Sequence, residues 1–330
     1  MRAALISAPG ALEVTTVPDP SPAAGEVVVE IAAVGICGTD LHILAGEHGR
    51  LPVVPGHETA GTVAAVGHDV DGLRVGDRVA VDPSLPCLRC RFCRRGRTNL
   101  CETLGALGVT VDGAAATFMR APASNCVVLP EHVALAGAAL IEPLSCAVHG
   151  YDVLGPQPGA SVLVYGAGTM GLLMVALAAR TGAVSVDVVE VDADRRTVAA
   201  SFGCSGVGAS ADELATAAWD VVIDATGNAA AIQDGVRRVA RGGTFLQFGV
   251  SSPETRVEIA PYEIYNREIT ITGSMAVLNS FERAADLLAA GVVDWQQFVT
   301  SQVPLEEMPR ALDAFARGEG LKTQVLPSSP

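Results

Sequence analysis

Hydrophobic residues are grouped differently in the two halves of the chain. In the first half, short runs rich in β-branched residues lie between glycine- and proline-containing turns, a pattern typical of β-strands. These runs are Glu26–Ile36, Ala60–Gly67 and Val75–Pro83. We therefore expect residues 1–150 to form a β-rich domain with few clear helices.

The pattern changes near residue 155, where apolar strands begin to alternate with helical segments. Helical spacing covers Thr169–Gly182 and Ala193–Gly203, and strands are expected at SVLVYG, VSVDVVEVD, WDVVIDATG and GGTFLQFGV. Alternation of this kind predicts a doubly wound parallel sheet, so the fold class is α/β.

A further amphipathic helix is expected over Ser280–Gly291, opened by a serine N-cap. The segment after it has mixed character. We assign residues 151–288 to the domain with the parallel sheet and residues 289–330 to a return to the first domain.

Composition and charge narrow the class of protein. The 330 residues are 49% hydrophobic and carry a formal net charge of −14. This balance suits two globular domains and disfavours nucleic acid or an anionic membrane as partner. The opening residues do not resemble a signal peptide, and every apolar stretch is far shorter than the roughly 20 residues of a membrane span. We expect a cytoplasmic protein that acts on a small molecule.

Four of the eight cysteines lie close together, at Cys87, Cys90, Cys93 and Cys101. Their spacing, C-x2-C-x2-C-x7-C, allows four thiolates to surround one Zn²⁺. An iron–sulfur cluster is the chemical rival, although its bacterial spacing differs in the last gap. A disulfide or redox pair is disfavoured in a reducing cytosol. Since four protein ligands leave no open position, a zinc ion here would be structural.

A second set of possible metal ligands lies in GICGTDLH and VPGHETAGTVAAVG, at Cys37, His57 and Glu58. One thiolate, one imidazole and one carboxylate leave a position for water or substrate on zinc, as a catalytic site requires. Each residue alone has a structural explanation, because a lone cysteine or histidine usually packs or forms hydrogen bonds.

The segment VLVYGAGTMG carries Gly166, Gly168 and Gly171 in the G-x-G-x-x-G pattern, after an expected strand and at the start of an expected helix. That context predicts a turn that brings the backbone and a helix N-terminus to a pyrophosphate. Glu190 lies where an acidic residue is expected to hold the ribose hydroxyls, with Asp192 as a nearby competitor. A carboxylate repels a 2′-phosphate, so NAD is favoured, while Arg195 and Arg196 keep NADP possible.

With these motifs in order, the chain resembles the zinc-dependent medium-chain dehydrogenase/reductase family, which includes the alcohol dehydrogenases. GHETAGTVAAVGHDV matches the zinc signature of that family, and the cysteine lobe and glycine turn follow in its order. The resemblance implies a GroES-like catalytic domain, a Rossmann domain, and one catalytic and one structural zinc per subunit.

Within the family, ALIEPLSCAVHGYDVL is similar to the polyol branch of sorbitol, xylitol and arabinitol dehydrogenases. That likeness implies that Glu142 lies at the catalytic metal, directly or through water. It also implies a secondary alcohol, such as a polyol, sugar alcohol or aminocyclitol, that is oxidised to the ketone with NAD(P). A threonine-type amino-alcohol dehydrogenase is the alternative enzyme, and a non-catalytic zinc scaffold or sensor that binds NAD is the alternative of another class.

The resemblance also implies roles for other residues. Zinc acidifies the substrate hydroxyl, hydride passes to the nicotinamide, and Thr39 and His42 relay the proton. The strands in TFLQFGV and ITITGSM are expected to pair across a homodimer or homotetramer. The expected cofactor-binding residues are Gly166, Gly168, Thr169, Met170, Gly171, Glu190, Arg195, Thr226, Gly227, Phe248, Gly249, Val250 and Ser274.

Overall fold

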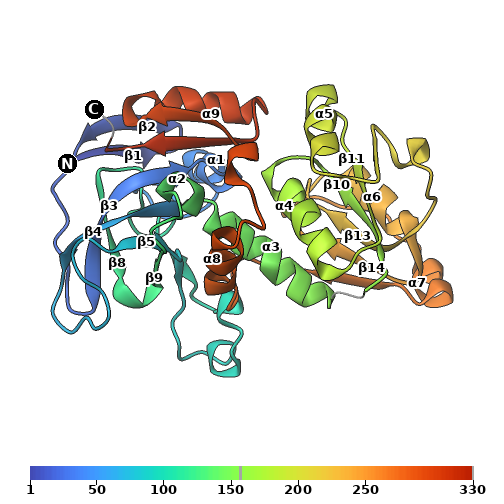
Figure 1. Ribbon diagram of the computed structural model, residues 1–330, viewed down its shortest axis with the longest axis horizontal. Coiled ribbons are helices and arrows are strands. Elements are labelled where there is room, and N and C mark those ends of the chain that lie inside the picture. Colours follow the sequence, from blue (N-terminus) through green and yellow to red (C-terminus); the bar gives the residue numbers. More distant parts are fainter. Residues whose placement is uncertain (156–157, 329–330) are drawn as a thin grey trace. The chain divides into compact units, whose positions relative to one another are not determined.

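The computed structural model describes residues 1–155 and 158–328 (Figure 1). The chain divides into two compact units, of which the first consists of Met1–Ser145 and Val277–Pro330 and the second of Cys146–Ala276. Unit 1 is therefore discontinuous in sequence. Each unit has its own sheet and its own apolar core.

Unit 1 is built on a mainly antiparallel sheet. In its described residues the sheet has seven strands in the order β16-β17-β3-β4-β5-β9, and the seventh, β8, pairs with the first half of β3 while β17 pairs with its end. Two small two-stranded sheets accompany it: the hairpin β1-β2, and β6-β7, whose strands are separated in sequence by the cysteine lobe. The strands are β1 Arg2–Ala8, β2 Ala11–Thr16, β3 Glu26–Gly35, β4 Glu58–Val66, β5 Arg78–Val81, β6 Ser84–Leu85, β7 Gly105–Ala106, β8 Phe118–Pro122, β9 Cys126–Val128, β16 Val299–Pro304 and β17 Lys322–Leu326.

The central strands of this sheet are apolar on both faces. Most residues of β3 are buried, which explains why its sequence reads as a nearly continuous run of Val, Ile and Ala. Short helices close the ends of the sheet. They are α1 Gly38–Leu44, α2 Leu135–Ala138, α8 Phe281–Ala289 and α9 Met308–Ala316, while α3 Ile141–Leu154 begins in unit 1 and continues into unit 2.

Unit 2 is the parallel sheet that the alternating sequence predicts. Its strand order is β12-β11-β10-β13-β14-β15 with every neighbouring pair parallel, which is the dinucleotide-binding order. The elements are β10 Ser161–Tyr165, α4 Thr169–Ala178, β11 Ser185–Val189, α5 Ala193–Ser201, β12 Gly206–Gly208, β13 Trp219–Asp224, α6 Ala229–Arg238, β14 Val239–Gln247, α7 Pro261–Arg267 and β15 Thr270–Gly273.

Two details differ from the sequence-based expectation. The predicted boundaries at 150/151 and 288/289 compare with 145/146 and 276/277, and the second differs because helix α8 belongs to unit 1. Ser280 is the N-cap residue of α8 as expected, but its side chain does not cap the helix. Its backbone is helical rather than extended, and its Oγ accepts a hydrogen bond from the Leu278 N–H at 3.3 Å.

Over the described ranges 1–155 and 158–328, no helix combines the length and the apolar character that crossing a membrane requires.

Candidate active site

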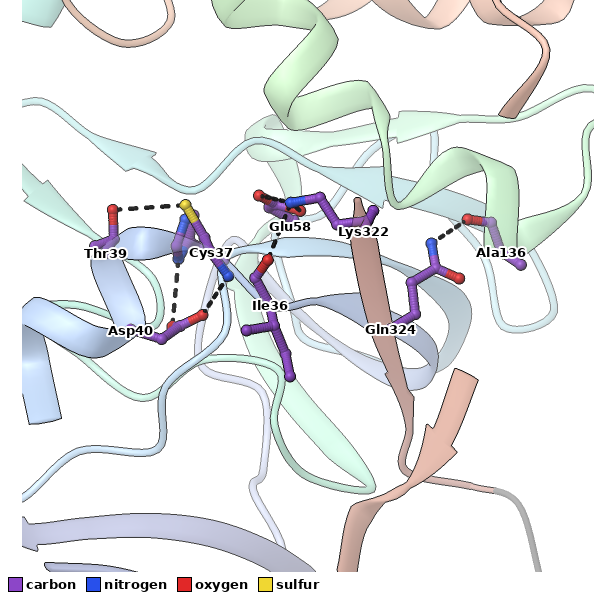
Figure 2. A network of polar contacts seen from close by, with 9 residues as sticks. Ile36, Cys37, Thr39, Asp40, Glu58, Ala136, Lys322 and Gln324 are labelled. Carbon is purple, nitrogen blue, oxygen red and sulfur yellow. Dashed lines mark hydrogen bonds and ion pairs between the residues drawn. The ribbon is translucent and has the colours of Figure 1, made fainter. Parts of the chain in front are cut away.

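Cys37 is held at the start of α1, directly after the central strand β3. It is the N-cap residue of that helix, and its N–H donates to Asp40 Oδ2 at 2.9 Å. Its Sγ lies 3.8 Å from Thr39 Oγ1. The short Cys37-x-x-Asp40 turn thus fixes the thiol beside the end of the sheet (Figure 2).

His57 and Glu58 enter the same place from the start of β4. Both are buried, and Asp40 Oδ1 lies 3.8 Å from His57 Nδ1. Neither of these two buried atoms has a hydrogen-bond partner. A carboxylate behind one ring nitrogen is the usual support of a metal-binding histidine, and it leaves Nε2 as the nitrogen for the metal.

The electrostatic surroundings of His57 are strongly acidic. Burial alone would lower the pKa of its imidazole, but Cys37, Asp40 and Glu142 together raise that pKa well above its usual value. Negative charges around a histidine also favour a cation bound at that place.

The donor atoms of Cys37, His57 and Glu58 lie within 4.8 Å of one another. Sulfur, nitrogen and oxygen donors at this separation fit a tetrahedral zinc ion that keeps an open position. Glu142, in the first turn of α3, is outside this group of three. It is nevertheless near enough to contribute to the raised pKa of both His57 and Lys322.

Lys322 is a site residue that the motifs did not indicate. It lies on β17 with an exposed fraction of 3%, and its Nζ donates to both carboxylate oxygens of Glu58 at 2.7 Å and to Ile36 O at 3.0 Å (Figure 2). Burial alone would lower the pKa of this ammonium, but Glu58 and Cys37 raise it. Lys322 is therefore a buried cation beside the expected metal site.

The other two residues expected at this site, Thr39 and His42, are on α1. Thr39 adjoins the Cys37 sulfur, as described above. The ring of His42 is more exposed, and its Nδ1 lies 2.6 Å from Glu47 Oε2.

The four clustered cysteines form a separate lobe in unit 1. Their sulfur atoms lie within 4.8 Å of one another, with 3.5 Å between Sγ of Cys90 and of Cys93, and none of the four is in a disulfide. Two short 3-10 helices, Cys93–Arg95 and Thr98–Leu100, shape the loop. Backbone N–H groups of Arg89 and Cys90 lower the pKa of Cys87 to about 6. Four convergent sulfurs of this kind suit a closed zinc site.

The glycine turn of unit 2 lies between β10 and α4. Gly166 has a φ of 96°, which disfavours residues with a side chain, and a Cβ on Gly171 would lie 1.9 Å from Gly166 O. Gly168 is the N-cap of α4, followed by Thr169 and Met170 in its first turn. The N-terminus of α4 thus directly follows the glycine turn, which is the arrangement that the sequence predicts.

Glu190 follows β11 and is fixed by the backbone around it. Its carboxylate accepts hydrogen bonds from the N–H groups of Ala167 at 2.8 Å and Asp192 at 2.9 Å. Asp192 caps α5 by accepting from the Arg195 N–H. The Arg196 guanidinium donates to the carbonyls of Glu190 and Val191 and so stabilises the chain just after β11.

A cavity of about 350 Å³ lies at the carboxyl ends of β10 and β11 in the parallel sheet. Its lining includes Gly166, Glu190 and Thr226. Beside it, Asp224 accepts hydrogen bonds from the backbone N–H groups of Thr226 and Gly227, which shapes the loop after β13.

The remaining residues expected at the cofactor come from the loops after β14 and β15. A Cβ on Gly249 would lie 2.4 Å from Gly227 N, so the loops after β13 and β14 touch. Phe248 N donates to Asp224 O at 3.0 Å, and the side chain of Val250 is exposed. Ser274 N donates to Gln247 O at 3.2 Å, and its buried Oγ has no hydrogen-bond partner.

Together, the units define a class of protein: an oxidoreductase that combines a metal site in a GroES-like unit with a dinucleotide-binding unit. Residues 23–131 match the alcohol dehydrogenase GroES-like domain family, and residues 169–290 match the zinc-binding dehydrogenase family. The chain belongs to the zinc-binding dehydrogenases of the alcohol dehydrogenase type.

Relatives support this membership over nearly the whole chain. D-arabinitol dehydrogenase 1 of Uromyces fabae is 36% identical over 92% of this chain and 90% of its own length. Sorbitol dehydrogenase of Bacillus subtilis is 34% identical over 99% of this chain and 98% of its own length.

Solved structures agree. A zinc-binding dehydrogenase from Sinorhizobium meliloti bound to NADP superposes with a TM-score of 0.95 at 32% identity, over 99% of both chains. An alcohol dehydrogenase from Escherichia coli CFT073 with NADH has a TM-score of 0.92 at 29% identity, over 99% of both chains. The predicted fold, family, enzyme class and cofactors, zinc and NAD(P), are confirmed.

Proposed function

We propose that the protein oxidises a secondary hydroxyl of a polyol or related sugar alcohol to the ketone. The observation that carries this proposal is the convergence of Cys37, His57 and Glu58 within 4.8 Å in a family whose relatives above include arabinitol and sorbitol dehydrogenases. Zinc, when bound, acidifies a hydroxyl group, and NAD(P) accepts the hydride.

In this proposal Cys37 and His57 hold the metal. One of the two carboxylates, Glu58 or Glu142, binds it as well, and the other lies close by. Asp40 orients His57 from behind. Thr39, next to the Cys37 sulfur, and His42, paired with Glu47, pass the substrate proton towards solvent. The four lobe cysteines hold a second, structural zinc ion.

For the cofactor, we propose NAD in preference to NADP. The carboxylate of Glu190 is fixed at the end of β11, where it would accept the ribose hydroxyls and repel a 2′-phosphate. The residues at the glycine turn and after β13, β14 and β15 complete the proposed binding site.

The experiment is a substrate panel on the purified, zinc-loaded protein. Polyols, aminocyclitols and L-threonine are each tested with NAD and with NADP. The proposal expects the highest kcat/KM for a polyol with NAD. A clear preference for L-threonine supports the amino-alcohol alternative, and tight NAD binding without turnover of any alcohol supports the scaffold or sensor.

We also propose a homodimer or homotetramer in the cytoplasm. Among residues 1–155 and 158–328, no strand pairs with the outer side of the edge strand β15, and Ile271 and Met275 expose apolar side chains in and beside it. The lobe thiols must stay reduced to bind metal, which suits a reducing compartment.

A further inference from the structure

The cavity at the carboxyl ends of β10 and β11 has a second acidic side chain in its wall, which the sequence motifs did not indicate. This residue is Asp234, in the second turn of α6. Glu190 lines the same cavity from the end of β11. Because the two carboxylates come from different elements, the cavity offers separate acidic groups to the parts of one bound molecule.

A hydrogen-bond network fixes Asp234 in this wall. Its Oδ2 accepts a hydrogen bond from the Tyr165 hydroxyl at 2.6 Å, and its Oδ1 accepts from Arg238 Nε at 3.2 Å. Arg238 also donates from Nη2 to Asp212 Oδ1 at 2.8 Å. Burial and the neighbouring Asp234 raise the pKa of the Tyr165 phenol, so its hydroxyl remains a donor. The carboxylate of Asp234 is therefore held from two elements, β10 and α6.

Asp234 can accept a further hydrogen bond in addition to these. An ionised carboxylate offers about four acceptor sites on its two oxygens. Tyr165 uses one of them, and the single Nε–H of Arg238 is shared between the two oxygens, at 3.2 Å and 3.3 Å. The side chain is also only half-buried, with an exposed fraction of 37%. A donor group on a molecule in the cavity can therefore bind to it.

The rest of the wall suits the flat faces of an aromatic ring. Small or β-branched side chains line it from three segments, after β11, after β12 and on α6: Val189, Val191, Ala209, Ala211, Ala230 and Ala231. A mainly apolar wall with a few fixed polar groups is the usual form of a cofactor site, in which the polar groups determine orientation and specificity.

The parts of a dinucleotide fall on this cavity in a fixed order. In the parallel-sheet fold the pyrophosphate lies at the glycine turn, and the acidic residue after the second strand, here Glu190, accepts the hydroxyls of the adenosine ribose. The base is joined directly to that ribose. It therefore occupies the remainder of the cavity, whose wall includes Asp234.

We propose that Asp234 is a specificity-determining residue that accepts a hydrogen bond from the amino group of the adenine base. This inference rests on the proposed cofactor site at the glycine turn and Glu190. The adenine amino group is a donor. Hypoxanthine has a carbonyl oxygen, an acceptor, in the same place, which a carboxylate repels. Asp234 thus selects the base, whereas Glu190 selects between a free and a phosphorylated ribose.

The test compares NADH with deamino-NADH, in which hypoxanthine replaces adenine. Binding of each to the purified, zinc-loaded protein is measured by nicotinamide fluorescence, without turnover. We expect the wild-type protein to bind NADH about 10-fold or more tightly, because a hydrogen bond to a charged group has an effect of about this size. A site built to bind a polar group rejects the analogue that lacks it.

Asp234→Asn should lower this preference to about one or reverse it. The amide keeps the shape of the side chain and an acceptor for Tyr165, and its NH₂ group can donate to the hypoxanthine carbonyl. Asp212→Asn is the matched control, because it removes a charge from the same network at a residue outside the described lining of the cavity. It should keep the wild-type preference. Thermal unfolding is measured for both variants.

A purely structural role for Asp234 predicts that Asp234→Asn weakens both cofactors by the same factor, so that their ratio does not change. That result, or a wild-type protein that binds both cofactors equally, overturns the inference. If Asp234→Asn does not fold, Asp234→Ala serves, since alanine is the residue most favourable to a helix. Without an acceptor the preference should fall to about one, and an unchanged preference contradicts the inference.

The same measurements separate this inference from the proposed function. A wild-type protein that binds neither NADH nor NADPH refutes the proposed cofactor site itself. Tight binding of NADH that weakens in Glu190→Ala, with no change of base preference in either Asp234 variant, refutes only the role of Asp234.

Discussion

The acidic groups around the imidazole of His57 all favour a positive charge, either on the ring or on a cation bound to it. Asp40 faces Nδ1, Cys37 lies on the metal side, and Glu142 adds a further negative charge. Two of the atoms involved, His57 Nδ1 and Asp40 Oδ1, are buried without hydrogen bonds. Metal binding would fix the ring and draw these two atoms together, which makes His57 the residue through which loss of metal is best tested.

Replacing His57 with alanine should remove the catalytic metal and abolish turnover, while NAD binds as before. The reason is that the proposed cofactor contacts lie in unit 2, whereas His57 belongs to unit 1. Metal content, NAD affinity and steady-state rate are measured on the same samples, with the exposed His68→Ala as control. Full activity of a metal-depleted His57→Ala protein would contradict the zinc mechanism.

Glu190→Ala should weaken NAD and improve NADP relative to it, because the substitution removes both a ribose acceptor and a repulsive charge. Asp192→Ala tests the other acidic residue that could hold the ribose, and the expectation here is that Glu190 sets the preference. The Asp192 substitution removes the N-cap of α5 and should lower stability by about 1 kcal/mol without changing cofactor preference. Affinities for both cofactors are measured for each protein. An unchanged NAD/NADP ratio in Glu190→Ala would move the preference to another residue, such as Asp192 or Arg195.

At this scale the sequence predicted the two groups of residues whose donor atoms the structure brings together, one at Cys37, His57 and Glu58 and the other at the four lobe cysteines. Lys322 was missed because its partner Glu58 is 264 positions away and a single lysine carries no spacing signal. Asp40 was missed although it lies within the quoted GICGTDLH. Its position three residues after Cys37 is the spacing of a helix N-terminal box, and that signal could have indicated α1 and the support of Cys37.

At the scale of elements, the cysteine lobe has little packing of its own. Its short helices have three residues each, and few of its side chains are buried. A loop of this kind has little apolar area with which to offset its conformational entropy. The four sulfur atoms are therefore its main source of order.

Cys93→Ser should lower the zinc content by about one ion per subunit and reduce thermal stability, because a structural zinc contributes directly to folding. Cys126→Ser, outside the lobe, is the control and should keep both metals. Elemental analysis and thermal unfolding are measured for each. Iron and sulfide in the wild-type lobe would contradict the zinc assignment.

The sequence predicted which segments are helices or strands more accurately than it predicted where those segments begin and end. The helix expected over Thr169–Gly182 is α4 plus a 3-10 turn that ends at Gly182, whose φ is 92°. The strand expected over Val75–Pro83 is only Arg78–Val81, because Asp77 closes a turn by accepting from the Arg74 N–H. Apolar runs mark buried segments, whereas local hydrogen bonds of this kind set where pairing starts.

At the scale of the whole molecule, the edge strand β15 is the feature expected to determine assembly. Ile271→Lys should convert the oligomer to a smaller species, because a charge on an edge strand opposes strand pairing between chains. Val184→Lys, an exposed apolar position of the same unit away from that edge, is the control. Light scattering after size exclusion gives the masses. A monomeric wild-type protein, or an Ile271→Lys oligomer of unchanged mass, would contradict the proposal.

The predicted order of domains did not reveal where unit 1 resumes. The amphipathic pattern of Ser280–Gly291 looks the same whether a helix covers a parallel sheet or an antiparallel one. Only its contacts place α8 in unit 1, whose second segment begins at Val277. Amphipathic periodicity shows that a helix face is buried without identifying the surface that buries it.

The discontinuity of unit 1 has a consequence for the order of events on the ribosome. Domains of a nascent chain fold as units from the N-terminus onward. Residues 146–276 are therefore complete before strand β17 is made, while Cys37, His57 and Glu58 have been synthesised long before. The Glu58–Lys322 ion pair therefore forms only after the second segment of unit 1 has been made, so the surroundings of the proposed metal site are completed last.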